Sequence, residues 1–163
     1  MIGNIGNQAL SEKKITKKTI FVIEASSYQL DYSKVFTSKY SAILNISPDH
    51  IERHKNLRNY INAKFKLLNS QSMDCTAFVK KNDLLINKKL NSKKFNPKII
   101  RVDLKKTNKI IKQLKNKYFL SSGNLENLSF VLQISETLNL NHKKLIKTLN
   151  RFEGLKYRQQ IIY

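Results

Sequence analysis

The sequence predicts an α/β domain with a mainly parallel sheet flanked by helices. Two short runs, "TIFVIEASS" (19–27) and "YSAILNIS" (40–47), are almost continuously apolar, as are strands buried on both faces of a parallel sheet. The segment 57–69 follows them and carries apolar residues at the spacing of a helix face. Strands that alternate with helices in this way are typical of parallel α/β folds.

The remaining elements follow from the same patterns. Ser47 and Pro48 form an N-cap and first-turn pair that predicts the start of a short helix. The helix predicted at 124–140 should carry Leu128, Val131, Leu132 and Ser135 on one face. The other predicted elements are a short helix (2–12), strands (75–81 and 98–103), a surface loop or short helix (82–97), a short strand or hairpin arm (117–121) and two amphipathic helices (124–140 and 142–152).

Length and composition indicate one domain in a reducing compartment. The chain has 163 residues, and no apolar run approaches the ~20 residues of a membrane span. The first residues lack a basic region followed by an apolar stretch, so no secretory signal is expected. Cys75 is the only cysteine and cannot form an internal disulfide. We therefore expect a cytoplasmic protein with no membrane partner.

The net charge of +20 raises the question of nucleic-acid binding. It comes from 31 lysines and arginines against 11 acids, and a basic surface attracts phosphates. Most of the basic residues are lysines, and their pairs are scattered rather than gathered on one arm or helix face. The composition therefore favours a general excess of surface lysine, and nucleic acid is not the expected partner.

One lysine interrupts the apolar face of the helix predicted at 57–69. Lys64 lies four residues after Tyr60 and three before Leu67, so it shares their face. One interpretation is a lysine whose stem packs on the apolar face while its ammonium reaches water. The other is a partly buried lysine with a chemical role.

The neighbours of Lys64 in the predicted fold support the second interpretation. Glu24 ends the first buried strand, and Asp49 and His50 follow the second. The carboxyl ends of parallel strands form the edge at which ligands bind. Burial lowers the pKa of a lysine, and a neutral amine can react with carbon dioxide to form an anionic carbamate. A carbamylated Lys64 beside Glu24 and His50 would offer oxygen and nitrogen ligands to Mg²⁺ or Mn²⁺.

Six segments, in this order and spacing, resemble the Mur ligase family. They are "GNIG" (3–6), "EASSYQL" (24–30), "LNISPDHIERH" (44–54), "YINAKFKLL" (60–68), "GNLENL" (123–128) and "FEGLKYR" (152–158). The paired serines followed by an aromatic residue, glutamine and leucine are most similar to the members that add D-glutamate. The resemblance covers nearly the whole chain and implies the central domain of such a ligase.

The resemblance also implies roles for particular residues. Lys64 corresponds to the carbamylated catalytic lysine, Glu24 to the metal-binding acid and His50 to a histidine near both metal and substrate. Substrate-binding positions are Asn4, Ser26 and Ser27. Positions close to ATP are Asn124, Asn127 and Arg158.

The reaction implied by the resemblance joins D-glutamate to UDP-N-acetylmuramoyl-L-alanine, a precursor of the bacterial cell wall. ATP phosphorylates the carboxylate of the sugar-peptide substrate, and the amine of D-glutamate attacks the acyl phosphate. Mg²⁺, or Mn²⁺, neutralises phosphate charge in such transfers. The expected partners are therefore the UDP-sugar peptide, ATP and D-glutamate.

The sequence also departs from the family, because it contains no glycine-rich phosphate loop. We expect residues 1–151 to be a central domain that is incomplete on its N-terminal side and lacks the phosphate-loop strand. Residues 152–163 would be the hinge and first strand of a further C-terminal domain. Three interpretations stay open at this point. The chain could be an enzyme part that needs a companion chain carrying the phosphate loop and terminal domains, a non-catalytic remnant, or a basic nucleic-acid-binding module.

Overall fold

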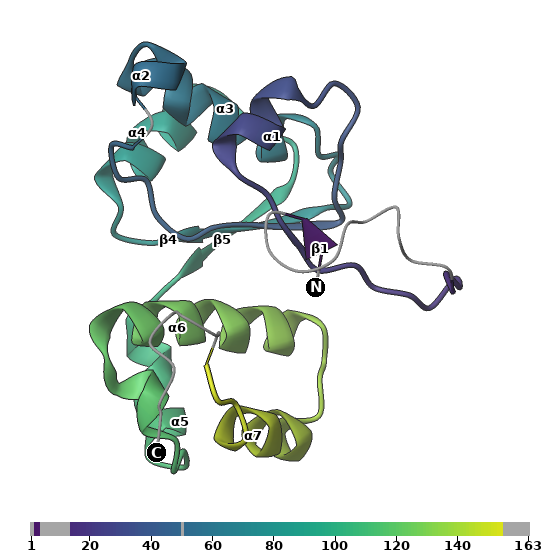
Figure 1. Cartoon of the computed structure of the whole chain (residues 1–163), viewed down its shortest axis with the longest axis vertical. Coiled ribbons are helices and arrows are strands. Elements are labelled where there is room, and N and C mark those ends of the chain that lie inside the picture. The colour runs from purple at the N-terminus through teal and green to yellow at the C-terminus, as the bar shows by residue number, and fades with distance from the viewer. Residues whose placement is uncertain (1, 4–13, 50, 155–163) are drawn as a thin grey trace.

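The described strands form two parallel sheets. The computed structural model describes residues 2–3, 14–49 and 51–154. Strand β1 (Ile2–Gly3) pairs with β2 (Ile23–Glu24), and β3 (Tyr40–Ile43), β4 (Thr76–Lys80) and β5 (Lys98–Val102) pair in that order. Helices flank the three-stranded sheet on both faces (Figure 1). The predicted α/β class with a parallel sheet is confirmed.

The three-stranded sheet has an apolar core on each face. Helices α3 (Leu57–Asn69) and α4 (Leu84–Asn91) cover one face, and α6 (Ser122–Thr137) covers the other (Figure 1). Because successive side chains of a strand point to opposite faces, Ala77 and Val79 meet the α3–α4 layer while Phe78 meets Phe130 of α6. These three β4 side chains are all buried, which is the burial pattern of a central parallel strand.

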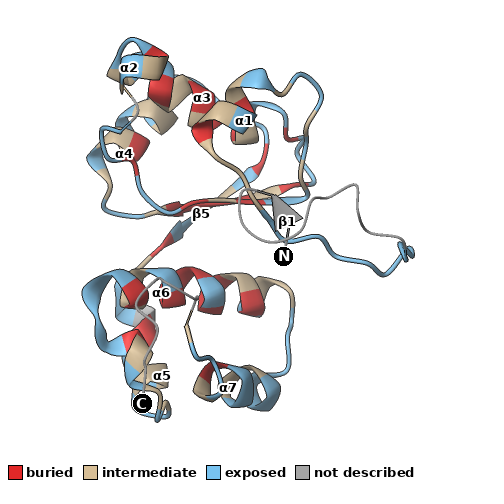
Figure 2. Cartoon of the chain, in the orientation of Figure 1, coloured by how far each residue is buried: buried red, intermediate tan, exposed pale blue. Residues whose placement is uncertain are grey.

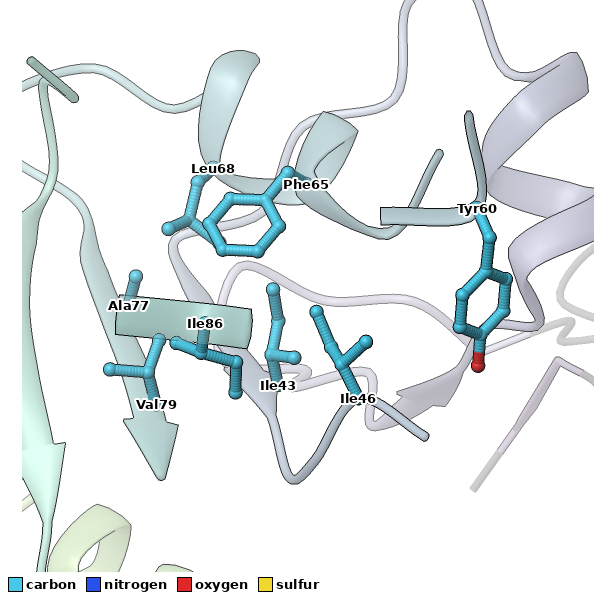
Figure 3. Close-up of a cluster of buried hydrophobic side chains, with 8 residues drawn as sticks. All are labelled: Ile43, Ile46, Tyr60, Phe65, Leu68, Ala77, Val79 and Ile86. Atoms are coloured by element: carbon cyan, nitrogen blue, oxygen red, sulfur yellow. The ribbon is translucent and has the colours of Figure 1, made fainter. Parts of the chain in front are cut away.

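The main core lies between the sheet and α3. Phe65 and Leu68 of α3 lie over Ala77 and Val79, with Ile86 of α4 beside them (Figure 3). The helix begins after Asn56, whose side chain accepts a hydrogen bond from the Asn59 N–H at 2.9 Å. The core and the cap together explain why the helix has the predicted bounds, 57–69.

Short helices complete both layers. On the α3 side, α1 (Ser27–Tyr32) and α2 (Ile51–His54) pack against α3. On the α6 side, α7 (His142–Asn150), η2 (Leu104–Lys106), α5 (Thr107–Ile111) and η3 (Lys117–Leu120) lie around α6. A second apolar cluster joins them, with Phe119, Leu128, Leu132 and Leu149 buried. None of the helices in the described part of the chain has the length and hydropathy that a bilayer crossing requires.

The predicted strand 19–27 is the largest error in the sequence analysis. Only Ile23 and Glu24 are in a strand, and residues 20–23 are exposed rather than buried (Figure 2). The physical reason is that β2 pairs only with β1 within the described residues, so no second neighbour completes a ladder there. The strand predicted at 40–47 likewise ends at Ile43.

Several smaller predictions also need correction. Within 2–12, Ile2–Gly3 is a strand rather than a helix, and residues 4–12 lie outside the described residues. The helix predicted to start at Ser47 starts at Ile51. Residues 117–120 form a 3₁₀ helix because Asn116 accepts a hydrogen bond from the Tyr118 N–H at 3.0 Å. Val131 is exposed, whereas Leu128, Leu132 and Ser135 are buried as predicted.

Asp83 joins α4 to the segment that follows β3. Its Oδ1 accepts from the Ile86 N–H at 2.9 Å as the N-cap of α4, and its Oδ2 accepts from the Ile46 N–H at 3.0 Å. We expect Asp83→Ala to lower the free energy of unfolding by about 2–3 kcal/mol in urea titrations, because it removes both acceptors. Asp83→Asn keeps one acceptor oxygen and should lose roughly half as much. An Asp83→Ala protein as stable as the wild type would contradict this role.

Candidate active site

A cavity of about 460 Å³ lies between the two sheets and contains two of the predicted site residues. Residues 21–25, around β2, form one wall, and residues 40–45, around β3, form the other. Lys64 and Leu67 of α3 and Leu30 of α1 also line it. We call this space the inter-sheet cavity. It brings Glu24, at the carboxyl end of β2, together with Lys64.

The surroundings of Lys64 explain a lysine on the apolar face of α3. Its side chain is half-buried, and its ammonium lies 5.1 Å from the centroid of the Tyr60 ring. This is within the range of a favourable cation–π contact. The ammonium therefore has an aromatic partner within its own helix while it lines the inter-sheet cavity beside β2.

The "EASSYQL" segment turns the chain from β2 into α1. Ser26 is the N-cap, and its hydroxyl accepts from the Gln29 N–H at 3.2 Å while the Ser26 N–H donates to Gln29 Oε1 at 2.9 Å. This capping box fixes the direction in which α1 leaves the sheet. Leu30 packs inward, and Glu24 remains at the strand end. Ser26 thus has a structural task as N-cap in addition to its predicted place near substrate, and Gln29 shares that structural task.

His54 is a buried residue beside the predicted substrate-binding Ser27, and the sequence analysis did not single it out. The side chains of His54 and Ser27 are both buried, and His54 Nε2 lies 3.1 Å from Ser27 Oγ. The imidazole packs between the rings of Tyr28 and Tyr60, at 5.7 and 5.5 Å between centroids. No spacing rule joins residues 27 positions apart, so only the packing of α2 on α1 and α3 reveals the pair.

The hydrogen bond between Ser27 and His54 should contribute measurably to stability. Ser27→Ala leaves the buried imidazole nitrogen without its partner, so we expect a loss of about 1–3 kcal/mol in the free energy of unfolding. Replacing both residues, Ser27→Ala with His54→Phe, should cost less than the sum of the two single changes, because no polar group is then left behind. Strictly additive losses in a urea-denaturation double-mutant cycle would show that the two side chains do not interact.

A charged network holds α1, α2 and α3 in this arrangement. Lys66 Nζ donates to Asp31 Oδ1 at 3.3 Å and also contacts the Asp31 carbonyl. Arg53 Nη2 donates to Tyr32 Oη at 2.6 Å, and the guanidinium lies 5.1 Å from the Tyr32 ring centroid. Neighbouring lysines of α3 thus differ in role, because Lys66 binds α1 whereas Lys64 lines the cavity.

The two predicted nucleotide-contacting asparagines lie in the first turns of α6. Asn124 is buried and its Nδ2 donates to the Tyr118 carbonyl at 2.8 Å, whereas Asn127 is exposed. An ion pair of 2.6 Å between Lys80 Nζ and Glu126 Oε1 joins this part of α6 to the carboxyl end of β4. Asn124 thus also holds the preceding 3₁₀ helix, whereas Asn127 lies on the exposed side of α6.

Three of the predicted site residues lie outside the described residues. They are Asn4, His50 and Arg158. Among the residues that the structure describes, no group of three or more histidine, cysteine, aspartate or glutamate side chains could hold a metal ion. The described part of the predicted metal site is therefore Glu24 and Lys64.

A divalent ion fits this pair only in one chemical form of Lys64. Magnesium and manganese take oxygen ligands, and an ammonium group would repel either ion. With a carbamate on Lys64, the cavity would present two oxygens opposite the Glu24 carboxylate. The donor set is thus compatible with the metal only after carbamylation.

Comparison with known proteins identifies the class of fold. Residues 3–145 match the Mur ligase middle domain, so the chain belongs to the Mur ligase family. This agrees with the parallel three-stranded sheet flanked by helices.

Its relatives include several ligases of one kind. The chain is 32% identical over 180 residues to the UDP-N-acetylmuramoylalanine–D-glutamate ligase of Rickettsia bellii, covering 98% of this chain and 40% of that protein. It is 31% identical over 177 residues to the ligase of the same name from Rickettsia prowazekii, with 98% and 39% covered. The enzyme of that name from Pseudothermotoga lettingae is 32% identical over 167 residues, with 98% and 38% covered. The chain thus spans about two fifths of the length of these relatives.

Proposed function

We propose that this chain is the central part of an ATP-dependent ligase that joins D-glutamate to UDP-N-acetylmuramoyl-L-alanine in the cytoplasm. The observation that carries the proposal is the shared cavity of Glu24 and Lys64, which come from two motifs 40 positions apart. The names of the relatives support D-glutamate as the amino acid that is added. In the proposed domain organisation, residues 1–151 form the central domain and residues 152–163 lead towards a C-terminal domain.

The predicted site residues have distinct proposed tasks. Glu24 and a carbamylated Lys64, with His50, hold a divalent metal whose positive charge stabilises the phosphate groups of ATP. Ser27 keeps a fixed hydroxyl orientation through His54 and contacts the sugar-peptide substrate together with Asn4 and Ser26. Leu30 and Leu67 add apolar side chains to the lining of the cavity.

The remaining proposed residues bind the nucleotide. Asn127 and Asn124, at the start of α6, and Arg158 contact ATP in this proposal. The γ-phosphoryl group passes to the substrate carboxylate and ADP remains. The amine of D-glutamate then attacks the acyl phosphate, the amide bond forms and inorganic phosphate leaves. The parts that bind UDP and D-glutamate would come from segments that match the rest of the relatives, in the same polypeptide or in a companion chain.

A chimera tests this function directly. This chain replaces the segment of the Rickettsia bellii ligase that it matches, and ADP release is measured with and without each substrate. We expect ADP release that depends on both UDP-N-acetylmuramoyl-L-alanine and D-glutamate, and none from the 163-residue chain alone. A folded chimera that releases no ADP would contradict the proposal and favour a non-catalytic remnant.

A further inference from the structure

We propose that the space between α3 and α4 binds a small aliphatic anion, namely a carboxylate or phosphate carried on a short alkyl body. This space is a cavity of about 390 Å³, bounded by the α3 face from Leu57 to Asn62 and by the α4 face from Leu85 to Ser92. We call it the α3–α4 groove. None of the described residues that line it also lines the inter-sheet cavity, so the site goes beyond the proposed ligase function.

Each helix directs one line of side chains into the α3–α4 groove. On α3, Arg58 and Ile61 are three residues apart. On α4, Leu85, Lys88 and Lys89 have the i, i+3, i+4 spacing of a single helix face. Residues at these spacings are neighbours on a helix surface. Each wall of the groove therefore combines an aliphatic side chain with a positive charge.

The floor of the groove is aliphatic. Leu57 and Ile61 of α3 and Leu85 of α4 line it, and all three are partly buried against the main core. Small-molecule sites are typically apolar cavities of about 300–1,000 Å³ with a few polar groups. None of the described lining residues is aromatic, so no ring is present on which a nucleobase could stack. The body that fits this floor is a short alkyl chain.

The polar groups at the rim of the groove present hydrogen-bond donors. Arg58, Lys88 and Lys89 are cations with donors only. Asn62 Oδ1 accepts from Lys89 Nζ at 2.7 Å, which engages the amide oxygen and leaves the NH₂ group to donate. The Ser92 hydroxyl donates to the Lys89 carbonyl at 2.7 Å. Because none of the described lining residues is acidic, the rim suits the oxygens of an anion.

The positive charges at the rim lack local compensation. Among the described residues, no ion pair involves Arg58, Lys88 or Lys89. Burial lowers the pKa of Lys89, and the nearby charges of Lys93 and Arg58 lower this pKa further. A bound anion would relieve the repulsion among these cations.

A general excess of surface lysine explains only part of this arrangement. Lys88 and Lys89 lie in the last turn of α4, where cations interact favourably with the helix dipole. Arg58 has the opposite relation to its own helix, because it is the second residue of α3 and the first turn there holds no acid. A cation at this unfavourable place, facing two lysines across an aliphatic floor, is the reason for inferring an anion site.

Nuclear magnetic resonance on the chain itself tests the site with four probes. Hexyl phosphate and hexanoate have both an alkyl body and an anionic head, whereas inorganic phosphate lacks the body and 1-hexanol lacks the charge. We expect both hexyl anions to show nuclear Overhauser contacts with the methyl groups of Leu57, Ile61 and Leu85. They should bind at least about tenfold more tightly than inorganic phosphate or 1-hexanol. The tighter of the two hexyl anions identifies the preferred head group.

Substitutions at the rim make the result specific to the groove. Arg58→Gln and Lys89→Gln each remove a charged donor and should weaken hexyl phosphate binding about tenfold. Arg58→Lys keeps the charge and should lose no more than about threefold. Lys94→Gln removes an equal charge from an exposed position outside the groove and should change binding by less than about twofold. The amide spectrum of each variant shows whether it is folded.

Three results would overturn the proposal. Inorganic phosphate that binds as tightly as hexyl phosphate would show only a general attraction to the net charge of +20. Equal weakening by Lys94→Gln and Arg58→Gln would show the same. Tighter binding of a capped hexaglutamate peptide than of either hexyl anion would assign the groove to an acidic protein segment. No ATP or sugar substrate is present, so a failure here is separate from a failure of the chimera assay.

Discussion

Lys64→Ala in the chimera should slow ADP release by at least about a hundredfold, which is the usual loss when a group that stabilises transition-state charge is removed. Among the described residues that line the inter-sheet cavity with Glu24, Lys64 is the only one with a side-chain amine, and alanine removes it. Lys64→Arg should be equally inactive, because a guanidinium remains charged and cannot form the carbamate. The measurement is the initial rate of ADP release with both substrates at saturation.

Lys66→Ala is the matched control. It lies on the same helix and removes the same charge, but its ammonium binds Asp31 instead of lining the inter-sheet cavity. We expect it to retain activity within about tenfold, with a modest loss of stability of roughly 0–1 kcal/mol from an exposed ion pair. A carbon-13 carbamate signal should appear with labelled bicarbonate in wild type and Lys66→Ala but not in Lys64→Ala. Full activity of Lys64→Ala would show that the lysine has only a packing role.

Phe65→Ala should destabilise the isolated chain by about 3–5 kcal/mol. The ring is fully buried between α3 and the sheet (Figure 3), and its centroid lies 5.5 Å from that of Phe95. Natural domains have only about 5–15 kcal/mol of stability, and among the described residues the apolar run 20–23 is exposed. We therefore expect most of the variant to be unfolded or aggregated at 37 °C, as measured by circular dichroism and by the fraction that stays in solution.

Two other substitutions separate the loss of the Phe65 ring from the core from a general sensitivity of the chain to substitution. Phe65→Leu keeps most of the apolar volume and should cost clearly less than alanine. Val131→Ala, at an exposed position of α6, should change the stability by no more than about 0.5 kcal/mol. If Phe65→Ala melted like Val131→Ala, the core between α3 and β4 would not be the centre of the fold.

The elements that the sequence predicted well are those in which local and tertiary preferences agree. Helix α3 has the predicted bounds because the apolar face, the Asn56 cap and the core all favour one register. Strands β4 and β5 fall within one residue of their predicted ends, since both are apolar runs with paired neighbours. At β2 the apolar run predicted burial, but burial depends on neighbouring strands, which the run itself does not encode.

The same distinction applies to the candidate site. Glu24 and Lys64 both line the inter-sheet cavity. Their proximity could be predicted because Glu24 ends a strand, where ligands bind in parallel sheets, and Lys64 lies on the apolar face of the helix that follows the next strand. The contact between Ser27 and His54 could not be predicted, because it depends on how α2 packs against two other helices. The capping box of Ser26 and Gln29 is readable from their spacing, yet only the structure shows that both hydrogen bonds form.

The central claim is that Glu24 and a carbamylated Lys64 face one divalent ion across the inter-sheet cavity. Anomalous X-ray scattering from crystals of the chimera grown with Mn²⁺ and a non-hydrolysable ATP analogue tests it most directly. We expect one manganese peak bordered by the Glu24 carboxylate and by extra density on the Lys64 amine, and no such peak in Lys64→Ala crystals. An active chimera whose manganese lies elsewhere, with an unmodified Lys64 directed into solvent, would contradict the claim.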